Sequence, residues 1–126
     1  MHKSRLAGFI IDCKTHDLKS AATFWGGALG MEVRALPGEE GTKYAQLVHP
    51  QDRLHVEVQS VAHPSRVHLD IETDDVEAEA RRLEQLGAKR VEKVKTWWVM
   101  EAPTGQRFCV VRAKSSTFAA EARAWE

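Results

Sequence analysis

Residues 66–87, RVHLDIETDDVEAEARRLEQLG, decide the fold because a strand pattern runs directly into a helix pattern. Apolar and polar residues alternate from Arg66 to Glu72, which predicts a half-buried strand. Asp74 followed by Glu77 predicts the start of a helix, and Gly87 predicts its end. The apolar stripe of this helix consists of Val76, Ala80, Leu83 and Leu86. Such a stripe needs a sheet to pack against, so a mixed α and β architecture is expected.

The first half of the chain has the same order of patterns. A strand pattern at 8–14 precedes a helix pattern that ends at Gly30, and the two halves align after a shift of about 58 positions. Three short strand patterns follow each helix, at 31–36, 43–49 and 53–59 and again at 89–94, 97–101 and 106–112. The sequence therefore predicts an α+β fold of two βαβββ units, at about 6–60 and 66–113, in a single domain over 1–126. Residues 115–126 are expected to form a C-terminal helix or tail.

The composition of the chain argues against two classes of binding partner, nucleic acid and membrane. Lys plus Arg number 18 and Asp plus Glu number 18, so no net field favours nucleic acid or an anionic membrane. No apolar run approaches the roughly 20 residues of a membrane span, and no signal peptide pattern is visible. We therefore expect a cytoplasmic protein that binds neither nucleic acid nor membrane, with Cys13 and Cys109 as reduced thiols.

An ordered set of short motifs resembles the vicinal-oxygen-chelate superfamily, and its glyoxalase-like domains in particular. The motifs are Ile11-Asp12-Cys13, Phe24-Trp25, Leu29-Gly30, Val67-His68-Leu69-Asp70, Asp74-Asp75-Val76-Glu77-Ala78, Leu86-Gly87-Ala88, Trp98-Val99-Met100, Pro103-Thr104-Gly105 and Phe108-Cys109-Val110. The superfamily includes glyoxalases, extradiol dioxygenases, fosfomycin-resistance transferases and bleomycin-resistance proteins. The resemblance implies curved half-barrel sheets, helices on their convex sides and a ligand cavity on the concave side.

Strand alternation then assigns each side chain to a face. Residues expected to pack against the helices are Phe9, Ile11, Leu54, Val56, Val58, Val67, Leu69, Ile71, Phe108 and Val110. Residues of the opposite parity are expected to line the cavity: Ile10, Asp12, His55, Glu57, Gln59, His68, Asp70, Arg107, Cys109 and Val111. This lining is unusually polar for the interior of a sheet.

Metal-dependent relatives take His or Gln from the first strand of a unit and Glu from its last strand. In this sequence the corresponding places hold Ile10, His68 and Cys109, with His55 taken as the counterpart of Cys109 in the first unit. One reading is a zinc ion bound by His55, His68 and Cys109. The favoured reading is that no metal or other cofactor is bound. If a metal is bound, zinc, nickel, manganese and iron are the candidates.

A metal-free site offers a second route to chemistry. A histidine beside a carboxylate can act as a general base near neutral pH, which makes Asp12, His68 and Glu57 the candidate catalytic residues. A structural ion pair is the plainer interpretation of the same residues. The candidate ligand-contacting residues are His55, Gln59, Asp70, Trp98, Arg107 and Cys109. Trp97 and Trp98 must point to opposite faces, and Trp98 is chosen as the one that meets ligand.

Two functions remain open. The resemblance implies a protein that binds a small oxygenated organic molecule, as a lyase, isomerase or dioxygenase with a degenerate metal site. The alternative is a non-catalytic sequestering protein of the bleomycin-resistance type, for which missing metal ligands are expected. Open sheet edges favour a homodimer in either case.

Overall fold

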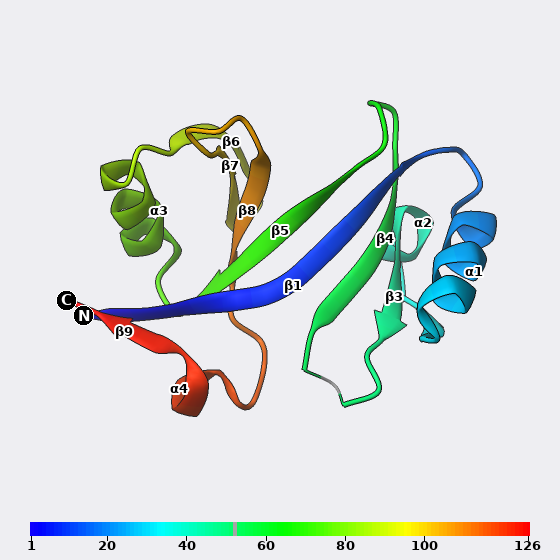
Figure 1. Ribbon diagram of the computed structural model, residues 1–126, viewed down its shortest axis with the longest axis horizontal. Coiled ribbons are helices and arrows are strands. Elements are labelled where there is room, and N and C mark those ends of the chain that lie inside the picture. Colours follow the sequence, from blue (N-terminus) through cyan, green and yellow to red (C-terminus); the bar gives the residue numbers. More distant parts are fainter. Residues whose placement is uncertain (52) are drawn as a thin grey trace. The chain divides into compact units, whose positions relative to one another are not determined.

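The computed structural model describes residues 1–51 and 53–126, and its elements follow the order expected of two βαβββ units (Figure 1). The first six elements are β1 (His2–Lys14), α1 (Leu18–Leu29), β2 (Glu32–Ala35), α2 (Glu40–Lys43), β3 (Tyr44–Val48) and β4 (His55–Val61). The remainder are β5 (Arg66–Thr73), α3 (Val76–Gln85), β6 (Lys89–Val94), β7 (Trp97–Glu101), β8 (Arg107–Arg112), α4 (Phe118–Glu121) and β9 (Arg123–Trp125). The α+β fold class is confirmed.

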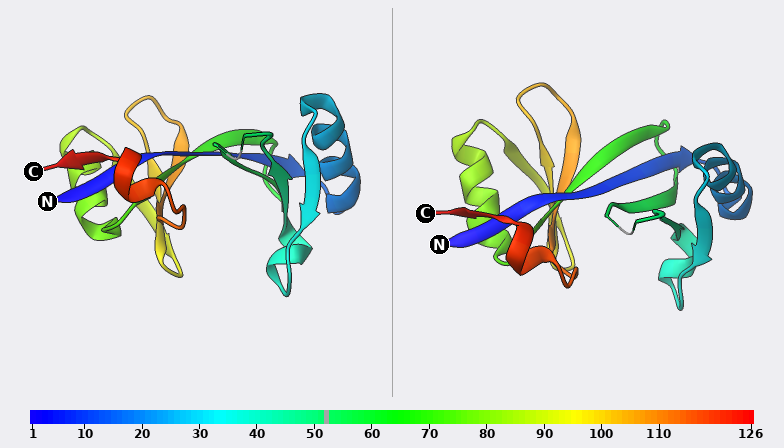
Figure 2. Two further views of the ribbon diagram at one scale, coloured as in Figure 1. Left: turned by 90° about the horizontal axis from the view of Figure 1, so that it is seen from below. Right: turned by 60° about the horizontal axis from the view of Figure 1, so that its bottom comes forward.

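Backbone contacts divide the chain into a unit of residues 8–68 and a unit of residues 1–7 with 69–126. In the 8–68 unit the strand order is β2-β3-β4-β1, with β1 and β4 parallel. Helix α1 packs on one face of these strands, where Ala22 joins a buried cluster with Leu47, Val56 and Val58 (Figures 1 and 2). The predicted parity is correct here, because Val56 and Val58 lie on the helix side.

Local chemistry fixes the ends of α1. The Asp17 side chain accepts a hydrogen bond from the Ser20 backbone N–H at 3.1 Å, which satisfies one of the unpaired donors at the helix start. Gly30 ends the helix in a left-handed conformation with φ of 67°, which costs a residue without Cβ little. The helix therefore ends at Gly30, as the sequence predicts.

In the other unit the strand order is β1-β5-β8-β7-β6, and α3 covers a cluster that includes Ala80, Leu83, Met100 and Val110. The predicted helix start is wrong by one residue. Asp75, not Asp74, caps α3 by accepting from the Ala78 N–H at 3.0 Å. The Asp74 carboxylate instead accepts from the Lys3 N–H at 2.8 Å.

The end of the chain combines a short helix with a strand. Helix α4 is followed by β9, which pairs antiparallel with the start of β1, His2 lying opposite Trp125 (Figure 2). A helix or a tail was expected for this segment, so strand β9 was not predicted. The pairing also explains why β1 begins at His2 rather than near residue 8, because residues 2–4 gain a strand partner that lies more than 100 positions away.

Two further expectations are wrong. Val67 and Leu69 were assigned to the helix-covered face, but they are 59% and 51% exposed because neither α1 nor α3 packs over them. Leu86, placed in the apolar stripe of α3, is 67% exposed. Glu79 takes a buried position on that helix instead.

Candidate functional site

The centre of the candidate site is a contact between β1 and the start of β5. Nδ1 of His68 lies 2.7 Å from Oδ2 of Asp12, and the Asp12 side chain is almost wholly buried. An ionised carboxylate can only accept, so Nδ1 carries the proton and donates to Asp12. This bond fixes the imidazole ring and leaves Nε2 as the nitrogen with the lone pair.

Only one of the two carboxylate oxygens of Asp12 has polar partners among the residues that the structure describes. Nε of Arg66 lies 3.7 Å from the same oxygen, Oδ2, whereas Oδ1 is buried with no hydrogen-bond partner among the residues that the structure describes. A buried carboxylate oxygen without a partner carries a desolvation cost of a few kcal/mol. A ligand that donates a hydrogen bond to Oδ1 would remove that cost.

The other polar residues predicted for this face of the 8–68 unit lie near the pair in register. Glu57 is opposite Ile10 and Gln59 is opposite Asp12, so the parallel ladder puts them on the same face. Nε2 of His55 lies 3.3 Å from the Glu57 carboxylate, and Gln59 donates to the hydroxyl of Tyr44 at 3.0 Å. Tyr44 is a member of this polar row that the sequence analysis missed.

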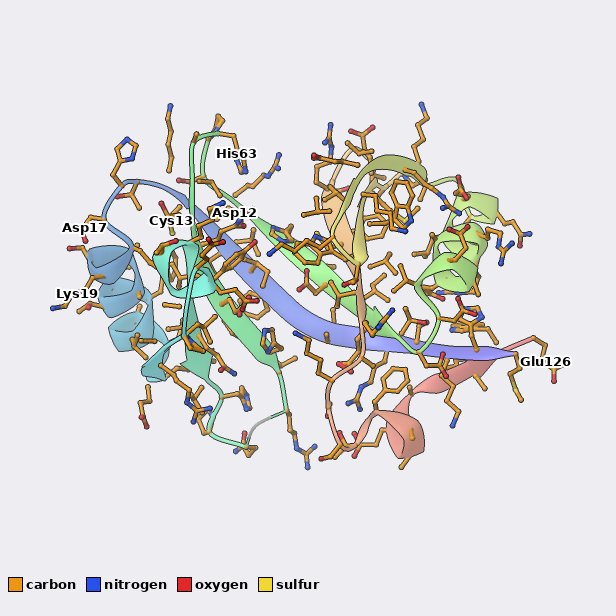
Figure 3. All side chains as sticks on the ribbon, turned by 180° about the vertical axis from the view of Figure 1, so that it is seen from behind. Asp12, Cys13, Asp17, Lys19, His63 and Glu126 are labelled. Carbon is orange, nitrogen blue, oxygen red and sulfur yellow. The ribbon has the colours of Figure 1, made fainter. Side chains whose placement is uncertain are left out.

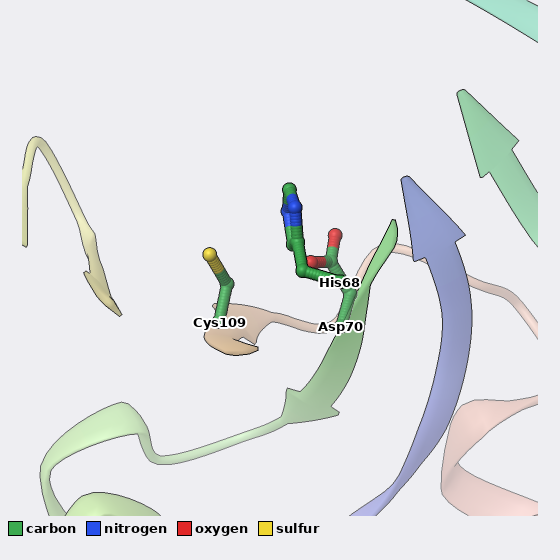
Figure 4. A group of neighbouring side chains, drawn as sticks. All are labelled: His68, Asp70 and Cys109. Atoms are coloured by element: carbon green, nitrogen blue, oxygen red, sulfur yellow. The ribbon is translucent and has the colours of Figure 1, made fainter. Parts of the chain in front are cut away.

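A second polar group follows along β5 and β8. His68 and Asp70 are two residues apart on one strand and share a face, and Asp70 lies opposite Cys109 in the parallel ladder. Their potential ligand atoms lie within 4.8 Å of one another (Figure 4). The predicted metal set is changed in one member, because Asp70 joins His68 and Cys109 whereas His55 pairs with Glu57.

The chemistry of this group suits zinc. Zinc accepts imidazole, thiolate and carboxylate ligands, which are the three types that this group offers. A metal-binding histidine usually donates its other N–H to a carboxylate, which is the contact that Asp12 makes with His68. The three residues therefore fit a divalent ion that takes nitrogen, sulfur and oxygen ligands.

The strand register corrects one assumed equivalence. Cys109 lies opposite Asp70 as Gln59 lies opposite Asp12, so Gln59 rather than His55 is the counterpart of Cys109. Sequence spacing alone could not show this, because the segments between the first and last strands differ in length in the two halves. Arg107, a predicted ligand contact, forms an ion pair with Glu101 at 3.1 Å.

The two tryptophans of β7 lie on opposite faces, as expected, but their assignment is reversed. Trp98 packs against the cluster under α3, and the Arg90 guanidinium lies 5.0 Å from its ring centre. Val99 lies opposite Cys109 in the antiparallel ladder, so Trp97, two residues away, shares the face of Cys109. Trp97 therefore lies on the same face of its sheet as Cys109.

The site and fold agree with a known family. Residues 8–111 match the Glyoxalase-like domain family, so the chain belongs to that family and to the vicinal-oxygen-chelate superfamily. No curated protein sequence matches the chain. In the described residues no helix is long and apolar enough to cross a membrane.

Solved structures resemble this fold at low sequence identity. A methylmalonyl-CoA epimerase from Mycobacterium tuberculosis has a TM-score of 0.64 and 16% identity, over 90% of this chain and 91% of that chain. A Mn(II)-bound glyoxalase from Novosphingobium aromaticivorans has a TM-score of 0.59 and 16% identity, over 89% of this chain and 40% of that chain. An NAD-dependent benzaldehyde dehydrogenase from Legionella pneumophila has a TM-score of 0.62 and 10% identity, over 84% of this chain and 99% of that chain. These likenesses concern the fold.

Proposed function

We propose that this chain binds a small oxygenated organic molecule at His68 and moves a proton on it, as an isomerase or lyase does. The observation that carries the proposal is the 2.7 Å contact between His68 and the buried carboxylate of Asp12. This contact sets the tautomer that a general base needs and holds the ring in one orientation. Oδ1 of Asp12 is a ready acceptor for a ligand hydroxyl or water.

The proton would follow a short path. Nε2 of His68 takes the proton from the bound molecule, and the resulting imidazolium is stabilised by the Asp12 carboxylate at Nδ1. The same nitrogen then returns the proton to another atom of the ligand. His55, Glu57 and Gln59 would contact the ligand from β4.

A ligand screen tests this proposal. The probes are small hydroxy acids, oxo acids and diketones, with binding followed by two-dimensional NMR and turnover by proton exchange with deuterated water. We expect a bound compound to shift the resonances of His68 and Asp12 and to exchange a carbon-bound proton. Binding without exchange would favour the sequestering protein of the bleomycin-resistance type. Binding that leaves His68 unshifted would contradict the proposal.

A divalent ion is a second candidate occupant, favoured by the group of His68, Asp70 and Cys109. These residues would hold the ion while Asp12 fixes the ring of His68. A bound ion would act as a Lewis acid on ligand oxygens. In that case His68 would hold the ion and Asp12 would orient the His68 ring, and neither side chain would take the proton from the ligand.

Cobalt binding checks this candidate. Cobalt(II) added to metal-free protein should give one equivalent of binding with a thiolate charge-transfer band, because Cys109 would be a ligand. The band should be lost in Cys109→Ser and binding weakened in Asp70→Asn. Cys13→Ser is the matched control, since burial raises the pKa of the Cys13 thiol and Cys13 lies outside the group. A band that persists in Cys109→Ser would rule out this site.

We further propose that the chain acts in the cytoplasm as a homodimer. The edge strands β2 and β6 each have one strand partner in the described structure, and paired edges are protected from aggregation. The exposed Val67 and Leu69 add apolar surface that no helix of the described chain covers.

A further inference from the structure

We propose that a basic pocket beside Asp12 binds an oxyanion, so that the ligand of the candidate site carries a carboxylate or phosphate group. The pocket has a volume of about 450 Å³ and lies wholly within the 8–68 unit. It is lined by residues 15–16, Lys43 and residues 59–63. This inference rests on the proposed function for the identity of the bound molecule, but the pocket itself does not depend on catalysis.

The charges around the pocket favour an anion. Lys43 contributes an ammonium group, and His16 contributes an imidazole that can donate a hydrogen bond. No carboxylate occurs among the described lining residues. The nearest acid in sequence, Asp17, is turned toward the start of α1, where it accepts from the N–H and the hydroxyl of Ser20.

Neutral donors complete the lining. Thr15 supplies a hydroxyl, whose oxygen accepts from the Asp17 N–H at 3.0 Å and whose proton can turn to a ligand. Gln59 supplies a side-chain amide and is anchored by its 3.0 Å bond to Tyr44. A cation together with several neutral donors is the arrangement that binds an oxyanion.

Arg66 links this pocket to the candidate site. Its Nη2 lies 3.4 Å from Nε2 of His63, which lines the pocket, and its Nε lies 3.7 Å from Oδ2 of Asp12. Asp12 and His63 lie at the same end of the unit, whereas Lys19 lies on α1 (Figure 3). One small molecule can therefore place its anionic group near Lys43 and its reacting atoms near His68.

Titration with inorganic phosphate and with malonate tests the proposal, at low ionic strength and with amide NMR as the readout. We expect shifts at Thr15, Lys43 and residues 59–63. Lys43→Met should raise the dissociation constant about tenfold or more, because it removes a charged hydrogen bond. Lys19→Met is the matched control and should leave binding unchanged, since Lys19 does not line the pocket. A preference for either anion supports the proposal and identifies the oxyanion.

The outcomes separate this inference from the proposed function. Equal loss of binding in Lys43→Met and Lys19→Met, or wild-type binding in Lys43→Met, would overturn the oxyanion pocket. His68→Ala should retain phosphate binding even if it loses turnover. Phosphate binding at Lys43 in a protein that binds no ligand at His68 would keep the pocket and reject the proposed reaction.

Discussion

Replacement of Glu79 by alanine should lower the free energy of unfolding by about 3–5 kcal/mol. The Glu79 side chain is fully buried on α3, where Arg82 and His2 form hydrogen bonds with it. Arg82 donates to both carboxylate oxygens at 2.9 and 2.8 Å, and His2 lies 2.8 Å from Oε1. Alanine would leave Arg82 and His2 without their acceptor and open a cavity under the helix. Chemical denaturation at pH 7 measures the loss.

The effect of Glu79 should depend on pH. Burial works to raise the pKa of this carboxyl group, but hydrogen bonds from Arg82, His2 and Ser4 outweigh it and hold the pKa below the ordinary value of 4.5. A lowered pKa means that the ionised group stabilises the fold above the unfolded pKa and loses this contribution as pH falls through the folded pKa. The wild type should therefore lose its advantage over Glu79→Gln in acid, below about pH 4.

Glu77→Gln is the matched control on the same helix. Glu77 forms ion pairs with Arg90 and Arg81, but its side chain is 52% exposed. Exposed pairs contribute about 0–1 kcal/mol, so this variant should change stability little. A loss in Glu79→Ala no larger than that in Glu77→Gln would show that the buried network does not stabilise the fold.

Substitution at the Asp12–His68 pair should have the largest effect on turnover of any substrate that the screen identifies. We expect His68→Ala to lower kcat about 10²–10⁴-fold, because it removes the group that takes the proton. Asp12→Asn should act through the ring of His68, since an amide can donate to Nδ1 and so favour the wrong tautomer. Its effect should fall mainly on kcat, with KM changed little.

Nitrogen NMR of the histidine rings measures which ring nitrogen of His68 carries the proton. If Asp12 only stabilised the fold, this tautomer would not change in Asp12→Asn. In the wild type the proton should reside on Nδ1 of His68, and in Asp12→Asn the population should shift toward Nε2. His49→Ala is the control, because His49 contacts Gln51 in the turn after β3. Unchanged kcat in His68→Ala would remove the pair from the reaction, whatever its tautomer.

The sequence was a good guide where one physical signal acts alone. Alternation identified the helix-covered face of β4, and Gly30 marked the end of α1. It was a poor guide where distant segments decide the outcome. Asp75 rather than Asp74 caps α3, because the Asp74 carboxylate is occupied by the Lys3 N–H.

In the candidate site, too, local sequence patterns predicted some features, whereas contacts between distant segments could not be predicted. The sequence named Asp12 and His68, since both lie at polar positions of strand patterns, and their parity put them on one face. It could not give the register between β5 and β8, so Asp70 was not recognised as a partner of Cys109 in a metal set. Glu79 was missed because a charged residue beside an apolar stripe is ordinarily exposed, and its partner His2 lies 77 positions away.

The pairing of β1 has a consequence for the order in which the chain folds. Residues 8–14 find their parallel partner in β4, so the strands of the 8–68 unit are complete once residue 68 has been synthesised. Residues 2–4 pair with residues 123–125, which are synthesised more than 100 residues later. The start of β1 must therefore stay unpaired with β9 until residues 123–125 have been synthesised, and closure of this long loop is expected to be a late and slow event.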